Sequence, residues 1–103
     1  MEEQRSSKRV KVNIRVAYRD DGYAYKIGRV SNISRSGAFI VTETPPNDVN
    51  EYLTASLDVD DLGKIVWIQG RVIRKTKNGM GVVFTRTDAK GLDLYLSYLG
   101  VAF

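Results

Sequence analysis

Two short polar clusters contain the residue types best suited to binding an anionic ligand that also carries hydrogen-bonding edges. The first runs from Arg5 to Arg9 with the sequence RSSKR and places two arginines four positions apart. The second runs from Asn32 to Gly37 with the sequence NISRSG and offers an amide, hydroxyls and a glycine within one expected tight turn. The planar guanidinium of arginine forms paired hydrogen bonds to a phosphate or to the O6 and N7 atoms of guanine. Taken singly, the first cluster also fits a solvated basic tail, and the second fits ordinary turn chemistry.

The composition narrows the chemistry that these clusters can serve. The chain has 103 residues, which allows one domain with one modest core. It contains neither cysteine nor histidine, which excludes disulfides and thiolate metal sites and removes the commonest general base. Neither a signal peptide nor an apolar run of membrane-spanning length is recognisable, so we expect a cytoplasmic protein that does not insert into a membrane.

The net charge of +4 is unevenly distributed along the chain. From Arg5 to Arg19 there are six basic residues and no acidic one. A basic end of this kind attracts an anionic partner, although a solubilising surface would have the same composition. The carboxylates of Asp58, Asp60 and Asp61 fall at an expected strand end and turn, where solvated acids are common.

Strand-like patterns occupy most of the chain. Apolar residues at every second position from Val10 to Tyr18 predict a strand over 10–19 with one buried face. Further strands are expected at about 23–30, 38–42, 53–59, 64–75 and 81–85. Gly70 predicts a bend or bulge, and Asn78 with Gly79 predicts a hairpin turn with positive φ angles. Trp67 stands in an apolar run and is expected to pack in the core.

The pattern changes to helical spacing near the C-terminus. Thr87 or Asp88 can cap a helix over about 87–99, and Gly100 can end it in the left-handed region. Six short antiparallel strands favour closure into a small barrel, because closure removes exposed edges. We therefore expect an all-β barrel at 10–103 with a C-terminal helix over one open end, preceded by a flexible arm at 1–9.

The two clusters together read as RxxxR followed by (D/N)xSxxG, and this pairing resembles the signature of the PilZ family. The resemblance extends from about Arg5 to Leu99. It implies a six-stranded antiparallel PilZ-type barrel with a terminal helix, which agrees with the fold expected from the strand pattern. It also implies a binding protein for the bacterial second messenger cyclic di-GMP, with that nucleotide as ligand and no other cofactor.

The resemblance assigns the ligand contacts residue by residue. Arg5 and Arg9 are expected to bind the phosphates and guanines from an arm that orders around the ligand. Asn32 and Ser34 are expected to form the opposite wall, and Gly37 is expected to allow a special backbone conformation or a close approach. Three further candidates are Lys8, Ser36 and Arg74, whereas Arg35 occupies a variable position of the motif and is expected at the surface.

The function implied is a receptor that orders its arginine arm and then signals to a partner protein. One alternative is a PilZ-like module that binds another protein and no nucleotide. A nucleic-acid-binding barrel would place aromatic side chains along a basic groove. Tyr18, Tyr23 and Tyr25 are the only such cluster here, and strand packing explains them. We therefore expect no polymer binding, and we expect no catalysis.

Overall fold

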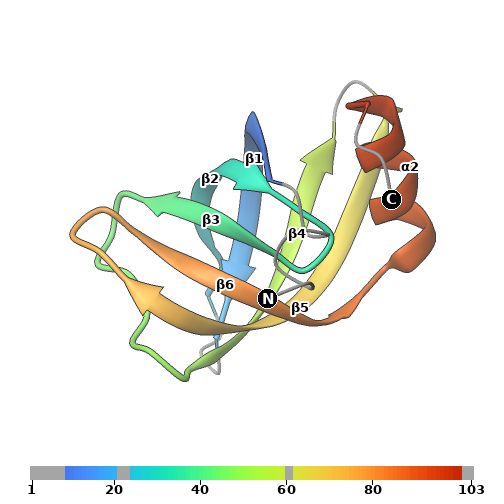
Figure 1. Ribbon diagram of the computed structural model, residues 1–103. Coiled ribbons are helices and arrows are strands. Elements are labelled where there is room, and N and C mark those ends of the chain that lie inside the picture. The colour runs from blue at the N-terminus through green and yellow to red at the C-terminus, as the bar shows by residue number, and fades with distance from the viewer. Residues whose placement is uncertain (1–8, 21–23, 60–61, 101–103) are drawn as a thin grey trace.

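The computed structural model describes residues 9–20, 24–59 and 62–100. Six strands in this part of the chain form a closed barrel in which every neighbouring pair is antiparallel (Figure 1). The order around the barrel is β1-β2-β3-β6-β5-β4. The elements are β1 (Val10–Arg19), β2 (Lys26–Ile33), β3 (Gly37–Thr42), β4 (Tyr52–Val59), β5 (Lys64–Lys75), β6 (Gly79–Thr87) and α2 (Ala89–Tyr98). The expected all-β barrel with a C-terminal helix is confirmed.

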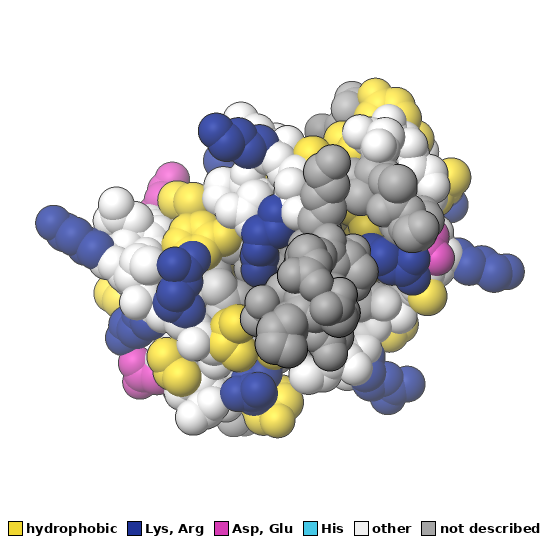
Figure 2. Space-filling view, viewed as in Figure 1, with side chains coloured by type: hydrophobic (Ala, Val, Ile, Leu, Met, Phe, Trp, Pro, Cys, Tyr) yellow, Lys and Arg dark blue, Asp and Glu magenta, His cyan; other side chains and the backbone are white. Residues whose placement is uncertain are grey.

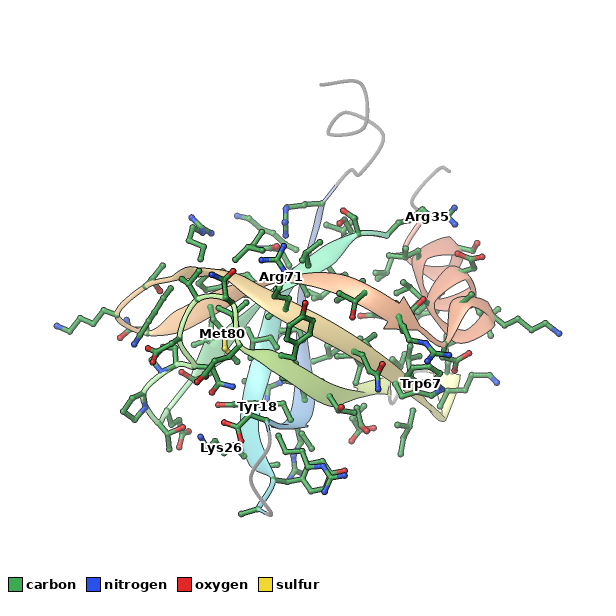
Figure 3. All side chains as sticks on the ribbon, turned by 90° about the horizontal axis from the view of Figure 1, so that it is seen from below. Tyr18, Lys26, Arg35, Trp67, Arg71 and Met80 are labelled. Carbon is green, nitrogen blue, oxygen red and sulfur yellow. The ribbon has the colours of Figure 1, made fainter. Side chains whose placement is uncertain are left out.

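Alternation along the strands produces the core. On β1, Val16 and Tyr18 are fully buried while Arg15 and Arg19 are exposed, as the period-two pattern predicts. The barrel interior holds mostly branched aliphatic side chains from all six strands, together with Tyr18 and Met80. Figure 3 shows these two side chains among the strands. The hydroxyl of Tyr18 is buried and has no hydrogen-bond partner among the described residues.

The helix α2 lies at one end of the barrel, beside β5 (Figure 1). The side chain of Asp88 caps its first turn by accepting a hydrogen bond from the backbone N–H of Gly91 over 3.1 Å. Leu92 and Leu96 are buried against the core, and Gly100 follows with a φ of 82°. The predicted cap and the left-handed helix end are confirmed. No helix among the described residues is both long and apolar enough to cross a membrane.

Two strand boundaries differ from those expected. β2 begins at Lys26 rather than residue 23 and continues through Ile33, so Asn32 belongs to the strand and not to the turn. β6 begins at Gly79 and ends at Thr87, which makes it longer than the predicted segment. At the C-terminal ends of β2 and β6 the pairing continues through the polar residues Asn32, Arg86 and Thr87, where the apolar alternation no longer marks the strand.

The β5–β6 hairpin is confirmed, but the positive φ angles expected at Asn78 and Gly79 are wrong. Among the described residues, positive φ occurs only at Asn50, Gly63 and Gly100. The turn is closed by a 2.9 Å hydrogen bond from the Thr76 amide to the carbonyl of Gly79. Gly79 instead fits a close strand approach, because a Cβ there would lie 2.6 Å from the carbonyl oxygen of Ile40.

The expectation that Trp67 packs in the core is wrong. Its side chain is 43% exposed, whereas Val66 and Ile68 on either side are buried. The β5–β6 register shifts between Gln69 and Gly70, but the extra residue is Thr85 on β6. The bulge expected at Gly70 therefore lies on the partner strand, and the pairing of β5 with β4 continues through Gly70 without a shift. Trp67 lies before that shift and points outward, like Ile65 two positions earlier on β5.

Candidate functional site

The two sequence motifs meet where β1 begins and β2 ends. Arg5 and Lys8 lie outside the described residues, so the first motif is represented by Arg9 alone. Arg9 is exposed and immediately precedes β1. Its Nη1 donates a 2.7 Å hydrogen bond to Oδ1 of Asn32. Antiparallel pairing of Val10 with Ile33 accounts for this proximity, because it places the residue before β1 beside the end of β2.

A β-bulge sets the position of Asn32. Between Val30 and Asn32 the strand β2 advances by two residues, while its partner β3 advances only from Ile40 to Phe39. The extra residue is Ser31. A bulge of this kind redirects the side chains that follow it, and such features are common beside functional sites. The result is that Asn32 stands directly opposite Phe39.

Ser34 organises the turn between β2 and β3. Its Oγ accepts hydrogen bonds from the backbone N–H groups of Ser36 and Gly37, both at 3.2 Å. Its own amide donates to the carbonyl of Gly37 over 2.8 Å. Ser34 is fully buried, whereas Ser36 is exposed with its hydroxyl 3.3 Å from Ser34 Oγ. In this structure the Ser34 hydroxyl therefore braces the turn, and the Ser36 hydroxyl is the one at the surface.

Gly37 is required by the packing of two strands. Its φ is not positive, so the special backbone conformation considered for it does not occur. A Cβ at this position would lie 2.4 Å from the carbonyl oxygen of Val82 on β6. Real side-chain carbons do not approach a backbone oxygen so closely. The close approach that Gly37 allows is therefore to β6.

Arg74 lies on the same outer surface as Asn32. Its guanidinium carbon is 5.3 Å from the centroid of the Phe39 ring, within cation–π distance. The row of Cα partners runs from Asn32 to Phe39, to Gly81 and to Arg74, across β2, β3, β6 and β5. A second bulge, with Ile73 as the extra residue on β5, brings Arg74 into this row.

Sequence reasoning did not identify Phe39 as part of this arrangement. The signal was present, because Phe39 lies between the inward-facing Ala38 and Ile40 and must face outward. Its ring is half-buried and Gly81 next to it carries no side chain. The guanidinium of Arg74 lies over the Phe39 ring, and Asn32 stands opposite Phe39 on β2. A planar base can stack on the flat face of a guanidinium held in this way.

The surroundings of the site are predominantly basic. Figure 2 shows that Lys and Arg side chains outnumber acidic ones on the face presented by β3 and β6. Arg35 is exposed as expected, and its guanidinium lies 3.5 Å from Asp93 on α2. Figure 3 shows Arg35 beside that helix. The charge distribution favours an anionic ligand at this face.

A closed six-stranded barrel with a terminal helix and these two motifs defines a small class of ligand-binding domains. The sequence matches the family model described as PilZ domain over residues 3–100. The chain belongs to the PilZ family. Domains of this family are generally receptors for cyclic di-GMP and act as binding or adaptor modules rather than enzymes.

Solved structures share the fold. The chain is similar to the PilZ domain of CeSA from a cellulose-synthesizing bacterium, with a TM-score of 0.70 and 18% identity over 91% of this chain and 97% of that one. It is also similar to the uncharacterized Legionella protein Lpg0364, with a TM-score of 0.57 and 22% identity over 89% of this chain and 92% of that one. Curated proteins compared with the sequence gave no match.

Proposed function

We propose that this chain is a receptor for cyclic di-GMP that orders its N-terminal arginines on the ligand and then addresses a partner protein. The observation that carries the proposal is the hydrogen bond between Arg9 and Asn32, which joins the two family motifs at one point of the barrel surface. Membership of the PilZ family supports the choice of ligand. The basic side chains around β3 and β6 support a ligand of negative charge.

Each contact has a chemical role in this proposal. Arg5 and Arg9 bind phosphate oxygens or the O6 and N7 edge of guanine through paired hydrogen bonds. The amide of Asn32 addresses the polar edge of a guanine with a donor and an acceptor. Phe39 and Arg74 provide a surface against which a guanine stacks.

The remaining motif residues support these contacts. Ser34 and Gly37 hold the turn and the β3–β6 approach in place, as their buried positions favour. Lys8 adds positive charge near the phosphates, and the exposed hydroxyl of Ser36 lies at the rim of the site. Substitutions of Ser34 or Gly37 should therefore lower mainly the stability of the barrel, and substitutions of Lys8 or Ser36 should lower mainly the affinity for the ligand.

Ligand binding exchanges one set of hydrogen bonds for another. The bond between Arg9 and Asn32 is exposed and contributes about 0.5–1.5 kcal/mol net. Charge-assisted bonds from arginine to two phosphates and two guanines exceed that amount and also offset the cost of ordering the arm. The ordered arm then presents a surface to the partner that differs from the free state.

Calorimetric titration with cyclic di-GMP tests the proposal. The wild-type chain should bind, while cyclic di-AMP and GTP serve as controls for guanine content and for the cyclic dinucleotide shape. Arg9→Ala should lose about 1–3 kcal/mol of binding free energy, whereas Arg71→Ala should bind like the wild type. Arg71 is the matched control because it hydrogen-bonds Asn50, on another part of the surface. No binding by the wild type at tens of micromolar ligand, or equal affinity of Arg9→Ala, would refute the assignment.

A further inference from the structure

A row of residues with exposed apolar side chains at both ends crosses the barrel surface on β2, β1, β4 and β5, whereas the row of the nucleotide site crosses β2, β3, β6 and β5. Ile27, Ala17, Ser56 and Trp67 are successive Cα partners across β2, β1, β4 and β5. Ile27 is 46% exposed and Trp67 is 43% exposed, while the small Ala17 and Ser56 between them are half-buried. We call these four residues the apolar row. It has bulky ends and a low centre.

A groove lies over the centre of the apolar row. It has a volume of about 170 Å³ and is lined by Ala17, Ile27, Ser56 and Ile65, with Arg15 and Asp58 at one side. Ile65 is 66% exposed, the highest value among the exposed large hydrophobic side chains of the described residues. Exposed apolar side chains that line one groove are typical of a surface that binds a partner.

A second row, which we call the arginine row, runs beside the first. It consists of Arg29, Arg15, Asp58 and Ile65, which are also successive partners across β2, β1, β4 and β5. A neighbouring pocket of about 320 Å³ is lined by Arg15, Arg29 and Asp58, so the two hollows share the side chains of Arg15 and Asp58. The arginine and apolar rows are two residues apart along each strand, which corresponds to about 6.6 Å.

Neither arginine of this row forms an ion pair with a carboxylate among the described residues. Arg29 donates to Oδ1 and to the carbonyl oxygen of Asn13, both uncharged acceptors. Arg15 makes no hydrogen bond or ion pair among the described residues. Asp58 is the one carboxylate among the described residues that line the two hollows. The local charge is therefore positive.

A further arginine borders the apolar row on its other side. Arg19 follows Ala17 by two positions on β1, just as Arg15 precedes it by two. The guanidinium of Arg19 lies 5.1 Å from the ring centroid of Tyr25, a contact that retains its charge. Along β1 the surface thus presents a cation, a small apolar residue and a cation at successive outward positions.

From this arrangement we infer that the apolar and arginine rows together form a docking surface for an acidic, apolar segment of a partner protein. An extended segment lying along β1 would place an apolar side chain between Ile27 and Ile65. Carboxylates two residues before and two residues after it would face Arg15 and Arg19. The inference rests on the proposed function, because it names a barrel surface through which the receptor would contact its partner in addition to the ligand-ordered arm.

Charge complementarity selects this occupant over a second copy of the chain. In a two-fold symmetric dimer the same patch faces itself, so a patch with the three cations Arg15, Arg19 and Arg29 and the single carboxylate Asp58 would meet a patch of the same net positive charge. The net charge of +4 adds to that repulsion. The exposed isoleucines in the groove favour an apolar side chain over a nucleic-acid backbone, which offers phosphates and sugars only.

Selection from a phage library of random dodecapeptides, against the folded full chain without nucleotide, tests the inference. We expect enriched sequences in which acidic residues flank an apolar residue at every second position. Synthetic versions of these peptides are then titrated while the fluorescence of Trp67, the one tryptophan of the chain, is recorded. Arg15→Glu and Ile27→Ser should each weaken binding roughly tenfold or more.

Matched variants control for effects on folding and on net charge. Leu94→Ser on α2 removes an apolar side chain of the same 46% exposure as Ile27, and Lys77→Glu reverses a charge at the β5–β6 turn. Both should bind the peptides as the wild type does. Thermal melting of each variant confirms that it is folded.

Three outcomes would overturn the inference: no enrichment, enrichment of basic or purely polar peptides, or acidic peptides whose affinity is unchanged by Arg15→Glu and Ile27→Ser. Binding of a single-stranded oligonucleotide in preference to the peptides would also overturn it. Calorimetry with cyclic di-GMP separates this inference from the proposed receptor function. If the chain binds the nucleotide but no peptide, only the docking surface is refuted. If it binds the peptides but not the nucleotide, only the nucleotide site is refuted.

Discussion

Arg9 and Asn32 are 23 positions apart in the sequence and share a 2.7 Å hydrogen bond at the start of β1 and the end of β2. The partners belong to different motifs, so the free protein already connects the two halves of the proposed site. A ligand that contacts both residues must first exchange this bond for its own. Their contributions to ligand affinity are therefore expected to depend on one another.

A double-mutant cycle measures that dependence. Arg9→Ala and Asn32→Ala are each expected to reduce cyclic di-GMP affinity, and the double variant should lose less than the sum of the two. The expected coupling is about 0.5–3 kcal/mol, as for residues in direct contact. Calorimetry on the four proteins gives the value. A cycle that pairs Arg9→Ala with Arg71→Ala should be additive, and additivity in the first cycle would contradict a shared site.

Gly37→Ala should destabilise the barrel, because the added Cβ would lie 2.4 Å from the Val82 carbonyl oxygen. The two strands must separate slightly to accept it, at an expected cost of about 1–3 kcal/mol in the free energy of unfolding. Urea denaturation followed by circular dichroism measures this cost. Gly81→Ala is the matched control, since its nearest neighbour would be 3.5 Å away. Equal stability of the two variants would show that β3 and β6 do not require the glycine.

Arg74→Ala should reduce cyclic di-GMP affinity by about 1–3 kcal/mol if a guanine stacks beside Phe39, as the proposed function requires. Arg74→Lys keeps the charge but loses the flat guanidinium, so it should recover only part of the affinity. Calorimetric titration of both variants distinguishes stacking from charge. Full recovery by lysine would indicate a purely electrostatic contact, and unchanged affinity of Arg74→Ala would remove the residue from the site.

Much of the fold could be predicted because the outward side of most strands is polar. β1 alternates strictly from Val10 to Arg19, and its predicted bounds match those observed. The cap at Asp88 and the left-handed Gly100 were likewise predictable, since local side-chain chemistry fixes both. Trp67 was misplaced because apolar residues on both faces of β5 hide the alternation. An apolar run alone does not tell which parity faces the core.

The candidate site was only partly accessible from sequence. The motif residues Asn32 and Gly37 could be named, but the bulge at Ser31 that places Asn32 opposite Phe39 depends on the pairing of two strands. Such register shifts arise from tertiary pairing and leave no local pattern. For the same reason, the contact between Phe39 and Arg74 could not be read from residues 35 positions apart.

Asp48 should titrate below its ordinary pKa of 3.8, because its carboxylate accepts a hydrogen bond from Lys75 over 2.7 Å and is attracted by that charge. A lowered folded-state pKa means that the pair stabilises the folded chain above the unfolded-state pKa. That contribution is lost as the pH falls through the folded-state value. Titration of the carboxyl carbon by NMR should give a midpoint below 3.8, and Lys75→Met should return it toward 3.8. A midpoint that is the same in both proteins would show that the surface pair does not persist in solution.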